Sequence, residues 1–249
     1  MVNILQALTR PSEAARFNGT YAPEGQNTTI HSDIAIDTWF PWPDFTYENI
    51  TRIFATELAR QYHGPLEPAA LDKDLLIFNE EVAEDGLRRF PVPVVNYALS
   101  LMPGAPHYGR GTRCLYFRLK ADWSLISDMR LDDNNRYVNL VPGDTKLSSK
   151  WTPDMLDDEE MFVEWQEVVS QTVTYTAERF GRYGFIVTDS VLVVLRLTRQ
   201  YTGAGLAANR SPRSAGSGSQ GGHSGSDTSM GMSDPSNPSQ PSSDSFHAW

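Results

Sequence analysis

The chain has 249 residues, a formal net charge of −10 at pH 7 and a single cysteine, Cys114. This length suits one substantial core. A lone cysteine excludes an internal disulfide and a cysteine-rich zinc site, and the acidic total gives no indication of a polyanion-binding surface. The sequence has neither an apolar run of the about 20 residues that span a membrane nor an N-terminal signal-peptide core. We therefore expect an intracellular protein, nuclear or cytoplasmic, that does not contact a membrane.

The first 74 residues are expected to form an N-terminal arm and a helical extension. Residues 1 to about 36 are polar and irregular, which favours an arm or a short helix with a loop. Thr38–Phe45 is aromatic and broken by prolines, so we expect an extended segment that packs its rings on the domain, with a ligand-binding patch as the alternative. Thr46 can cap a helix over Tyr47–Tyr62.

Residues 75–203 are expected to form the core domain. Apolar residues at helical spacing predict a helix from about Ile77 to Arg89 and another over Val94–Leu101, because Pro91 and Pro93 interrupt the pattern. The segment Arg113–Leu119 alternates and is rich in strand-forming residues, so it predicts a first strand.

Two short apolar runs follow, and each carries an acid. The first run is Asp122–Ile126, and the second is Tyr137–Val141, which continues into Pro142-Gly143-Asp144-Thr145-Lys146. The turn-forming residues Asp132–Asn135 lie between the two runs and favour a hairpin.

The rest of the core reads as a helix and two strands. Acids crowd the start of a predicted helix from Pro153 to about Phe180, as the helix dipole prefers. Strands are predicted over Tyr183–Thr188 and Val191–Leu197. From about Gly203 the composition becomes Gly, Ser, Pro and Asn, so we expect residues 204–249 to be a disordered tail.

The two acid-bearing runs also predict a site. Neighbouring strands can bring Asp122 and Asp144 together, and Lys146 shares a face with Asp144 because residues two apart in a strand point to the same side. Two acids and a lysine in this arrangement can hold a divalent cation and a polarised water beside each other.

Three stretches, ADWSLI, VPGDTKLSSKW and RYGFIVTDSVLVVLRL, carry a resemblance to a known family. Together with the element order, they make the chain resemble the PD-(D/E)XK nuclease-like superfamily over residues 75 to about 200, and in particular uncharacterised fungal proteins that carry this domain. The resemblance implies an α/β fold, a restriction-endonuclease-like α-β-β-β-α-β core with an acid at the second strand and a D/E-x-K at the end of the third.

The family pattern assigns roles to individual residues. Asp122 would be the first acid, although Ala121 stands where the family often has proline, and Asp144-Thr145-Lys146 would be the D-x-K. Glu80 is the best match for a further acid on the first core helix, with Glu57 as the alternative. Gln171 would contact the site or the substrate from the last helix.

A literal Pro-Asp pair occurs elsewhere in the chain but does not fit the pattern. Asp44 of Pro43-Asp44 lies 100 residues before Asp144, with two helical segments between them, whereas Asp122 lies 22 residues before it.

The resemblance implies a metal-dependent nuclease that acts on nucleic acid, on DNA rather than RNA. Asp122, Asp144 and a main-chain carbonyl at Thr145 would bind Mg²⁺ or Mn²⁺, which lowers the pKa of a bound water. Lys146 would position or deprotonate that water and stabilise charge in the transition state.

The same residues also allow an interpretation in which their roles are purely structural. Asp122 can cap a strand, Asp144 can sit in a turn, and Lys146 can pair with Asp144 on an exposed face, which is worth about 0–1 kcal/mol. The protein would then be a catalytically inactive nuclease-like scaffold or protein-interaction module. A nucleotide-binding protein is a weaker option, because the chain has no Gly-rich phosphate loop.

Overall fold

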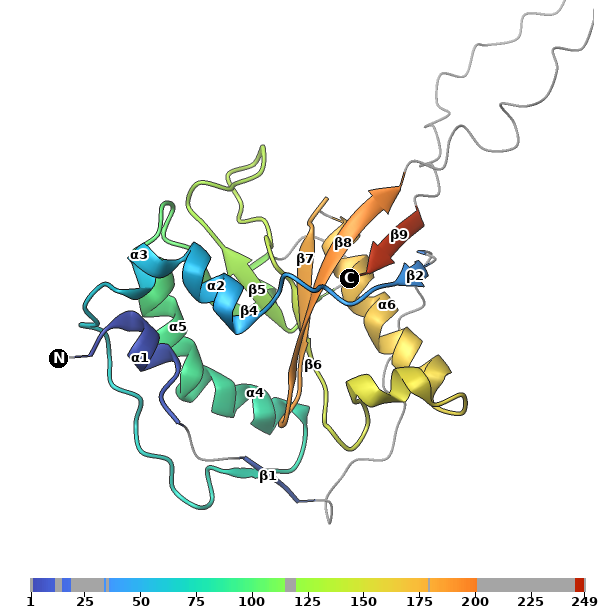
Figure 1. The fold of residues 1–249 in the computed structure, drawn as a ribbon, viewed down its shortest axis with the longest axis horizontal. Coiled ribbons are helices and arrows are strands. Elements are labelled where there is room, and N and C mark those ends of the chain that lie inside the picture. The colour runs from blue at the N-terminus through green and yellow to red at the C-terminus, as the bar shows by residue number, and fades with distance from the viewer. Residues whose placement is uncertain are drawn as a thin grey trace, which may run out of the picture.

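The structure is a computed structural model that describes residues 2–11, 15–18, 34, 36–114, 120–178, 180–200 and 245–248. It is a mixed α/β fold with a mixed central sheet (Figure 1). The central strands are β4 (His107–Arg110), β5 (Trp123–Ile126), β6 (Gly143–Thr145), β7 (Tyr183–Val187) and β8 (Leu192–Gln200).

These five strands lie in sequence order, and their directions are mixed. The pairs β4–β5, β5–β6 and β7–β8 are antiparallel, whereas β6 and β7 are parallel. A parallel pair needs a long crossover connection, and the chain supplies it with α6 (Phe162–Glu178) after the short 3-10 helix η3 (Pro153–Asp157). The β6 strand therefore has β5 on one side and β7 on the other.

The crossover helix α6 forms the main core with the last two central strands. Its buried side chains Val168, Val169 and Val173 belong to one cluster with Ile186 of β7 and Leu195 of β8. Full burial of an aliphatic side chain contributes about 1.5–3 kcal/mol, so this cluster fixes α6 beside the parallel pair.

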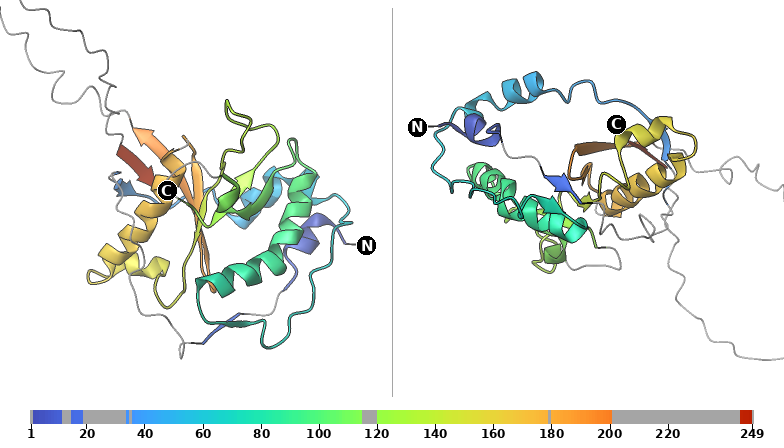
Figure 2. Two further views of the ribbon diagram at one scale, coloured as in Figure 1. Left: turned by 180° about the vertical axis from the view of Figure 1, so that it is seen from behind. Right: turned by 90° about the horizontal axis from the view of Figure 1, so that it is seen from below.

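Two further helices, α4 (Glu80–Arg89) and α5 (Pro91–Ser100), run as a continuous arc on the other side of the strands from α6 (Figure 1; Figure 2, left). The side chain of Asn79 accepts a hydrogen bond from the N–H of Val82 and so caps the start of α4. Pro91 occupies the first turn of α5, where its missing N–H costs nothing. The helix α4 contacts β6, and its first residue, Glu80, interacts electrostatically with Lys146.

The N-terminal region contributes short elements around this core. They are α1 (Ile4–Leu8), β1 (Arg16–Phe17), β2 (Ile36–Trp39), α2 (Tyr47–Ile53), α3 (Ala55–Leu58) and β3 (Leu76–Ile77). The aromatic segment packs rings on the domain as predicted, since Trp39 makes an edge contact with Trp165 and Trp42 stacks on Tyr183.

Two predicted strands differ from the structure. The first central strand is β4, which precedes the predicted segment Arg113–Leu119; Gly111–Cys114 forms the 3-10 helix η2, and residues 115–119 lie outside the described residues. The run Tyr137–Val141 is not a strand, and only an isolated bridge joins Tyr137 to Leu131.

Helix boundaries also differ from the predictions. The first predicted helix ends at Leu58 and is interrupted at Phe54, α4 begins at Glu80, and α5 begins at Pro91. The helix predicted from Pro153 divides into η3 and α6. By contrast, β5, β7 and β8 lie where the sequence predicts strands.

The expectation of a disordered tail covers residues 204–249, and within that range the structure describes Ser245–Ala248. They pair as β9 with β8 on one side and β2 on the other, which extends the sheet to seven strands. Residues 201–244, which carry the rest of that expectation, lie outside the described residues. In the part of the chain that the structure describes, no helix is long and apolar enough to cross a membrane.

Candidate active site

A buried ion pair lies at the end of β6, where Lys146 directly follows the strand. Nζ of Lys146 lies 2.8 Å from Oδ2 of Asp144, and the two residues are only 4% and 2% exposed. The Asp144–Lys146 pair that the purely structural interpretation expects is therefore present, but it is buried rather than exposed. A buried pair differs from a surface one, because removing either partner leaves a charge without compensation in a low-dielectric interior.

Asp122 stands directly before β5 and reaches across to β6. Its Oδ2 accepts a hydrogen bond of 2.9 Å from the main-chain N–H of Thr145, the residue between Asp144 and Lys146. The indole Nε1 of Trp123 donates a second bond, of 2.8 Å, to Oγ1 of Thr145. Two consecutive residues at the start of β5 thus fix the middle residue of the Asp-Thr-Lys sequence.

The two aspartates influence each other. Burial raises the pKa of Asp144; the Lys146 ammonium opposes this shift, and the Asp122 carboxylate reinforces it. Like charges in one site disfavour double ionisation. The structure therefore brings together Asp122, Asp144 and Lys146, the three residues on which the sequence interpretation depends.

Lys146 keeps its proton. Burial alone lowers the pKa of its ammonium, but the negative charges of Asp144, Glu80 and Asp122 outweigh burial, and the net shift is upward. Near neutral pH this side chain is a cation and not a free base.

Glu80, the predicted further acid, is the first residue of α4 and belongs to the same group of charges. Burial raises its pKa, Lys146 and Lys150 lower it, and Asp122 raises it. Glu57, the alternative, lies on α3 and is not among the charges that shift the pKa of Asp144 or Lys146. The structure thus favours Glu80.

Gln171 lies on the buried face of α6 and bonds to a tyrosine one turn later. Its Nε2 donates to the hydroxyl of Tyr175 at 2.7 Å, while its buried Oε1 has no hydrogen-bond partner in the described part of the chain. Burial raises the pKa of Tyr175, and Asp144 and Asp122 raise it further, so this hydroxyl lies within the field of the two acids. Gln171 is therefore linked to the two acids through its hydrogen bond to the Tyr175 hydroxyl.

Sequence reasoning missed two residues of this group, Tyr175 and Glu84. Burial raises the pKa of the Glu84 carboxyl, and a hydrogen bond from Arg88 opposes the shift while Asp122 adds to it. Both follow a predicted site residue by four positions, Glu84 after Glu80 and Tyr175 after Gln171. That spacing is one helical turn and places both side chains on the site face.

The loop after Lys146 is tied to the β7–β8 turn. The N–H of Lys146 donates to the carbonyl of Val187 at 3.0 Å, and the N–H and hydroxyl of Ser148 donate to the carboxylate of Asp189 at 2.7 and 2.6 Å. Asp189 is a turn residue, as expected, and it anchors the segment that carries the lysine.

Among the described residues, no group of three or more His, Cys, Asp or Glu side chains has the geometry of a metal site. The donors predicted for Mg²⁺ or Mn²⁺ are two carboxylates, Asp122 and Asp144, and the main-chain carbonyl of Thr145. Oδ2 of Asp144 is buried and is engaged by the Lys146 ammonium at 2.8 Å. The donors fit Mg²⁺ or Mn²⁺ in kind, because a hard cation prefers oxygen ligands and two neighbouring carboxylates supply them.

Comparison of the chain with protein-family models, with curated proteins and with solved structures finds no match.

Proposed function

We propose that the protein is a metal-dependent nuclease of the PD-(D/E)XK type with a restriction-endonuclease-like core, which hydrolyses phosphodiester bonds in nucleic acid. The observation that carries the proposal is the hydrogen bond that the N–H of Thr145, the residue between Asp144 and Lys146, donates to Asp122. It joins two acids and a lysine from neighbouring strands in the order that the family pattern requires. The strand order β4-β5-β6-β7, with α6 between the parallel strands, supports the same fold type.

Asp122, Asp144 and the Thr145 carbonyl would hold Mg²⁺ or Mn²⁺. When bound, the ion supplies positive charge at the phosphate and lowers the pKa of a coordinated water.

The chain's own residues have separate roles in this proposal. Lys146, which keeps its proton, stabilises the negative charge that develops on the phosphate oxygens. The carboxylate of Glu80 accepts a proton from the attacking water, for which its raised pKa suits it. The oxygen of the attacking water then forms the new bond to phosphorus while the bond to the leaving oxygen breaks. The leaving oxygen takes a proton from solvent.

A second candidate, a nuclease-like scaffold without catalysis, is favoured by the burial of the ion pair. Asp144 and Lys146 are almost fully enclosed, and catalysis requires that a phosphate reach both groups. A protein that only retains the fold has no such requirement.

The deciding experiment is cleavage of single- and double-stranded DNA and RNA with Mg²⁺ or Mn²⁺ at low salt, where weak electrostatic binding is strongest. Wild type is compared with Asp144→Asn, Lys146→Met and Glu80→Gln, and each variant is checked for folding by circular dichroism. Glu81→Gln is the matched control, because Glu81 is the exposed neighbour of Glu80 on α4.

The nuclease proposal expects cleavage by wild type and by Glu81→Gln, and at least a hundredfold loss in the other three variants, about 3 kcal/mol of transition-state stabilisation. Absence of cleavage from wild type together with absence of metal-induced thermal stabilisation would establish the scaffold instead.

A further inference from the structure

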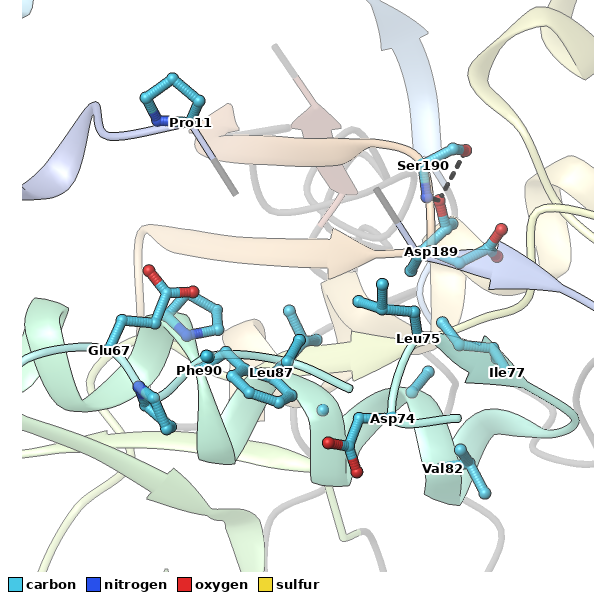
Figure 3. Close-up of a pocket in the computed structure, with 18 of the residues that line it drawn as sticks. Pro11, Glu67, Asp74, Leu75, Ile77, Val82, Leu87, Phe90, Asp189 and Ser190 are labelled. Atoms are coloured by element: carbon cyan, nitrogen blue, oxygen red, sulfur yellow. Dashed lines mark hydrogen bonds between the residues drawn. The ribbon is translucent and has the colours of Figure 1, made fainter. Parts of the chain in front are cut away.

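A cavity of about 770 Å³ adjoins α4 (Figure 3), and neither Glu80 nor Glu84 lines it. Its walls are mainly apolar side chains from α4 and from the segment around β3, and in Figure 3 Leu87, Phe90, Leu75 and Ile77 line it. The turn between β7 and β8 borders the cavity with Asp189 and Ser190. Pockets of small organic ligands have this size and this kind of lining.

Gly86 lies in the wall of this cavity and in the interior of α4. Glycine in a helix interior costs about 1 kcal/mol relative to alanine. Packing among the described residues does not require a glycine here, because a Cβ built at Gly86 would meet none of their atoms within 4 Å. A glycine at such a position lets a ligand approach the helix backbone.

The charges around the cavity select the kind of ligand. Glu67, Asp74 and Asp189 line it with three carboxylates, against the single guanidinium of Arg10. Arg10 lies 3.2 Å from Glu67, and Arg89 lies 2.8 Å from Asp74.

Asp189 differs from the other two carboxylates. It accepts hydrogen bonds from Ser148, and no cationic side chain among the described residues lies within 4 Å of it. Figure 3 shows Asp189 and Glu67 at opposite ends of the apolar wall. Asp189 therefore borders one end of the cavity and has no counter-ion among the described residues.

We propose that this cavity binds an organic cation with an apolar body. The body lies against the α4 backbone at Gly86 and the apolar side chains beside it. The ammonium or guanidinium group pairs with Asp189. None of the residues proposed for catalysis lines this cavity, and the proposal does not rest on the nuclease activity, although Asp189 also anchors the loop after Lys146 through Ser148.

The test measures binding of three probes of one size by calorimetry and by the amide NMR shifts of α4 and the β7–β8 turn. The probes are phenylbutylamine, phenylbutanol and phenylbutyrate. The amine is expected to bind at least about tenfold more tightly than the alcohol, because a charge-assisted bond is stronger than a neutral one, and the acid is expected to bind least.

Three variants localise the binding. Asp189→Asn should remove the advantage of the amine over the alcohol and leave alcohol binding unchanged. Gly86→Leu should place its side chain where the probe body lies against α4 and weaken binding of both probes at least about tenfold, whereas Glu81→Leu, with the same side chain placed outside the cavity on the same helix, should leave binding intact.

Two results would overturn the proposal. One is an amine that binds no more tightly than the acid. The other is equal binding by Gly86→Leu and Glu81→Leu, which decides the matter even if Asp189→Asn does not fold, because neither leucine variant changes the Ser148–Asp189 bonds.

Discussion

The carboxylate of Asp122 accepts a hydrogen bond from the main-chain N–H of Thr145 at 2.9 Å. Thr145 is fully buried, so this N–H has no access to water when its acceptor is removed. Asp122 therefore has two separable properties, a negative charge beside Asp144 and an acceptor that joins β5 to β6.

Two substitutions separate these properties. Asp122→Asn keeps an acceptor oxygen for the Thr145 N–H and removes only the charge, whereas Asp122→Ala removes both. The alanine variant should be less stable than the asparagine variant by about 1–3 kcal/mol, the cost of a buried donor without a partner. Urea denaturation at neutral pH measures the difference, and equal stability of the two variants would show that the hydrogen bond contributes nothing.

The buried pair Asp144–Lys146 should show strong energetic coupling. Lys146→Met leaves the buried Asp144 carboxyl without its partner and should cost up to about 3–5 kcal/mol at alkaline pH, where the carboxyl is charged, and less at acidic pH, where it is protonated. Asp144→Asn combined with Lys146→Met should lose less than the sum of the single losses, because the double variant has no uncompensated charge at either position. A double-mutant cycle by chemical denaturation measures the coupling, and single-variant losses that add within about 0.5 kcal/mol would contradict it.

The acids and the lysine could be predicted because their arrangement follows from local rules. Residues two apart in a strand share a face, so Asp144 and Lys146 had to point the same way once β6 formed. Their burial could not be predicted in the same manner. It depends on how α6 and α4 pack around β6, which is a tertiary arrangement that the spacing of residues does not determine.

The wrongly predicted strand at Tyr137–Val141 has an identifiable cause. Asn139 bonds to β5 with its side chain, since its Nδ2 donates to the carbonyl of Trp123 at 2.9 Å and its Oδ1 accepts from the N–H of Leu125 at 3.2 Å. The amide group therefore takes the place of a main-chain partner. Apolar periodicity predicts strand pairing but does not distinguish a side-chain amide from a backbone one in that role.

A side-chain amide also bonds to the main chain of the edge strand β4, a strand that the sequence pattern did not predict. The side chain of Asn96 on α5 donates to the carbonyl of Tyr108 at 3.0 Å and accepts from its N–H at 2.7 Å. An unpaired strand edge is a template for association with another chain, and Asn96 occupies this edge at Tyr108.

Substitution of Asn139 should consequently destabilise the protein. Asn139→Leu leaves the carbonyl of Trp123 and the N–H of Leu125 without their partners and should cost about 1–3 kcal/mol for each group that stays buried. Asn134→Leu is the matched control, because Asn134 is exposed and its side chain makes none of these bonds. A thermal melt of both variants checks the prediction, which is wrong if the two melt at the same temperature.

The raised pKa of Asp144 predicts that metal binding depends on pH. Burial and the neighbouring Asp122 favour the protonated form of this carboxyl. A metal ligand must be deprotonated, whereas an ordinary aspartate, with a pKa of about 3.9, would already be ionised in mildly acidic solution. The affinity for Mn²⁺ should therefore continue to rise as the pH increases through the neutral range, and binding should release protons.

The same shift has the opposite effect on the metal-free protein. A carboxyl group whose pKa is higher in the folded state than in the unfolded state stabilises the fold most at acidic pH, and this contribution declines as the pH rises. Calorimetric titration with Mn²⁺ in buffers of different ionisation enthalpy measures both affinity and proton release. Asp144→Asn is the control, because its side chain has no proton to lose at this position, and it should bind Mn²⁺ weakly with little proton release. A wild-type affinity for Mn²⁺ that is constant above about pH 6 would show that Asp144 is not a metal ligand with a raised pKa.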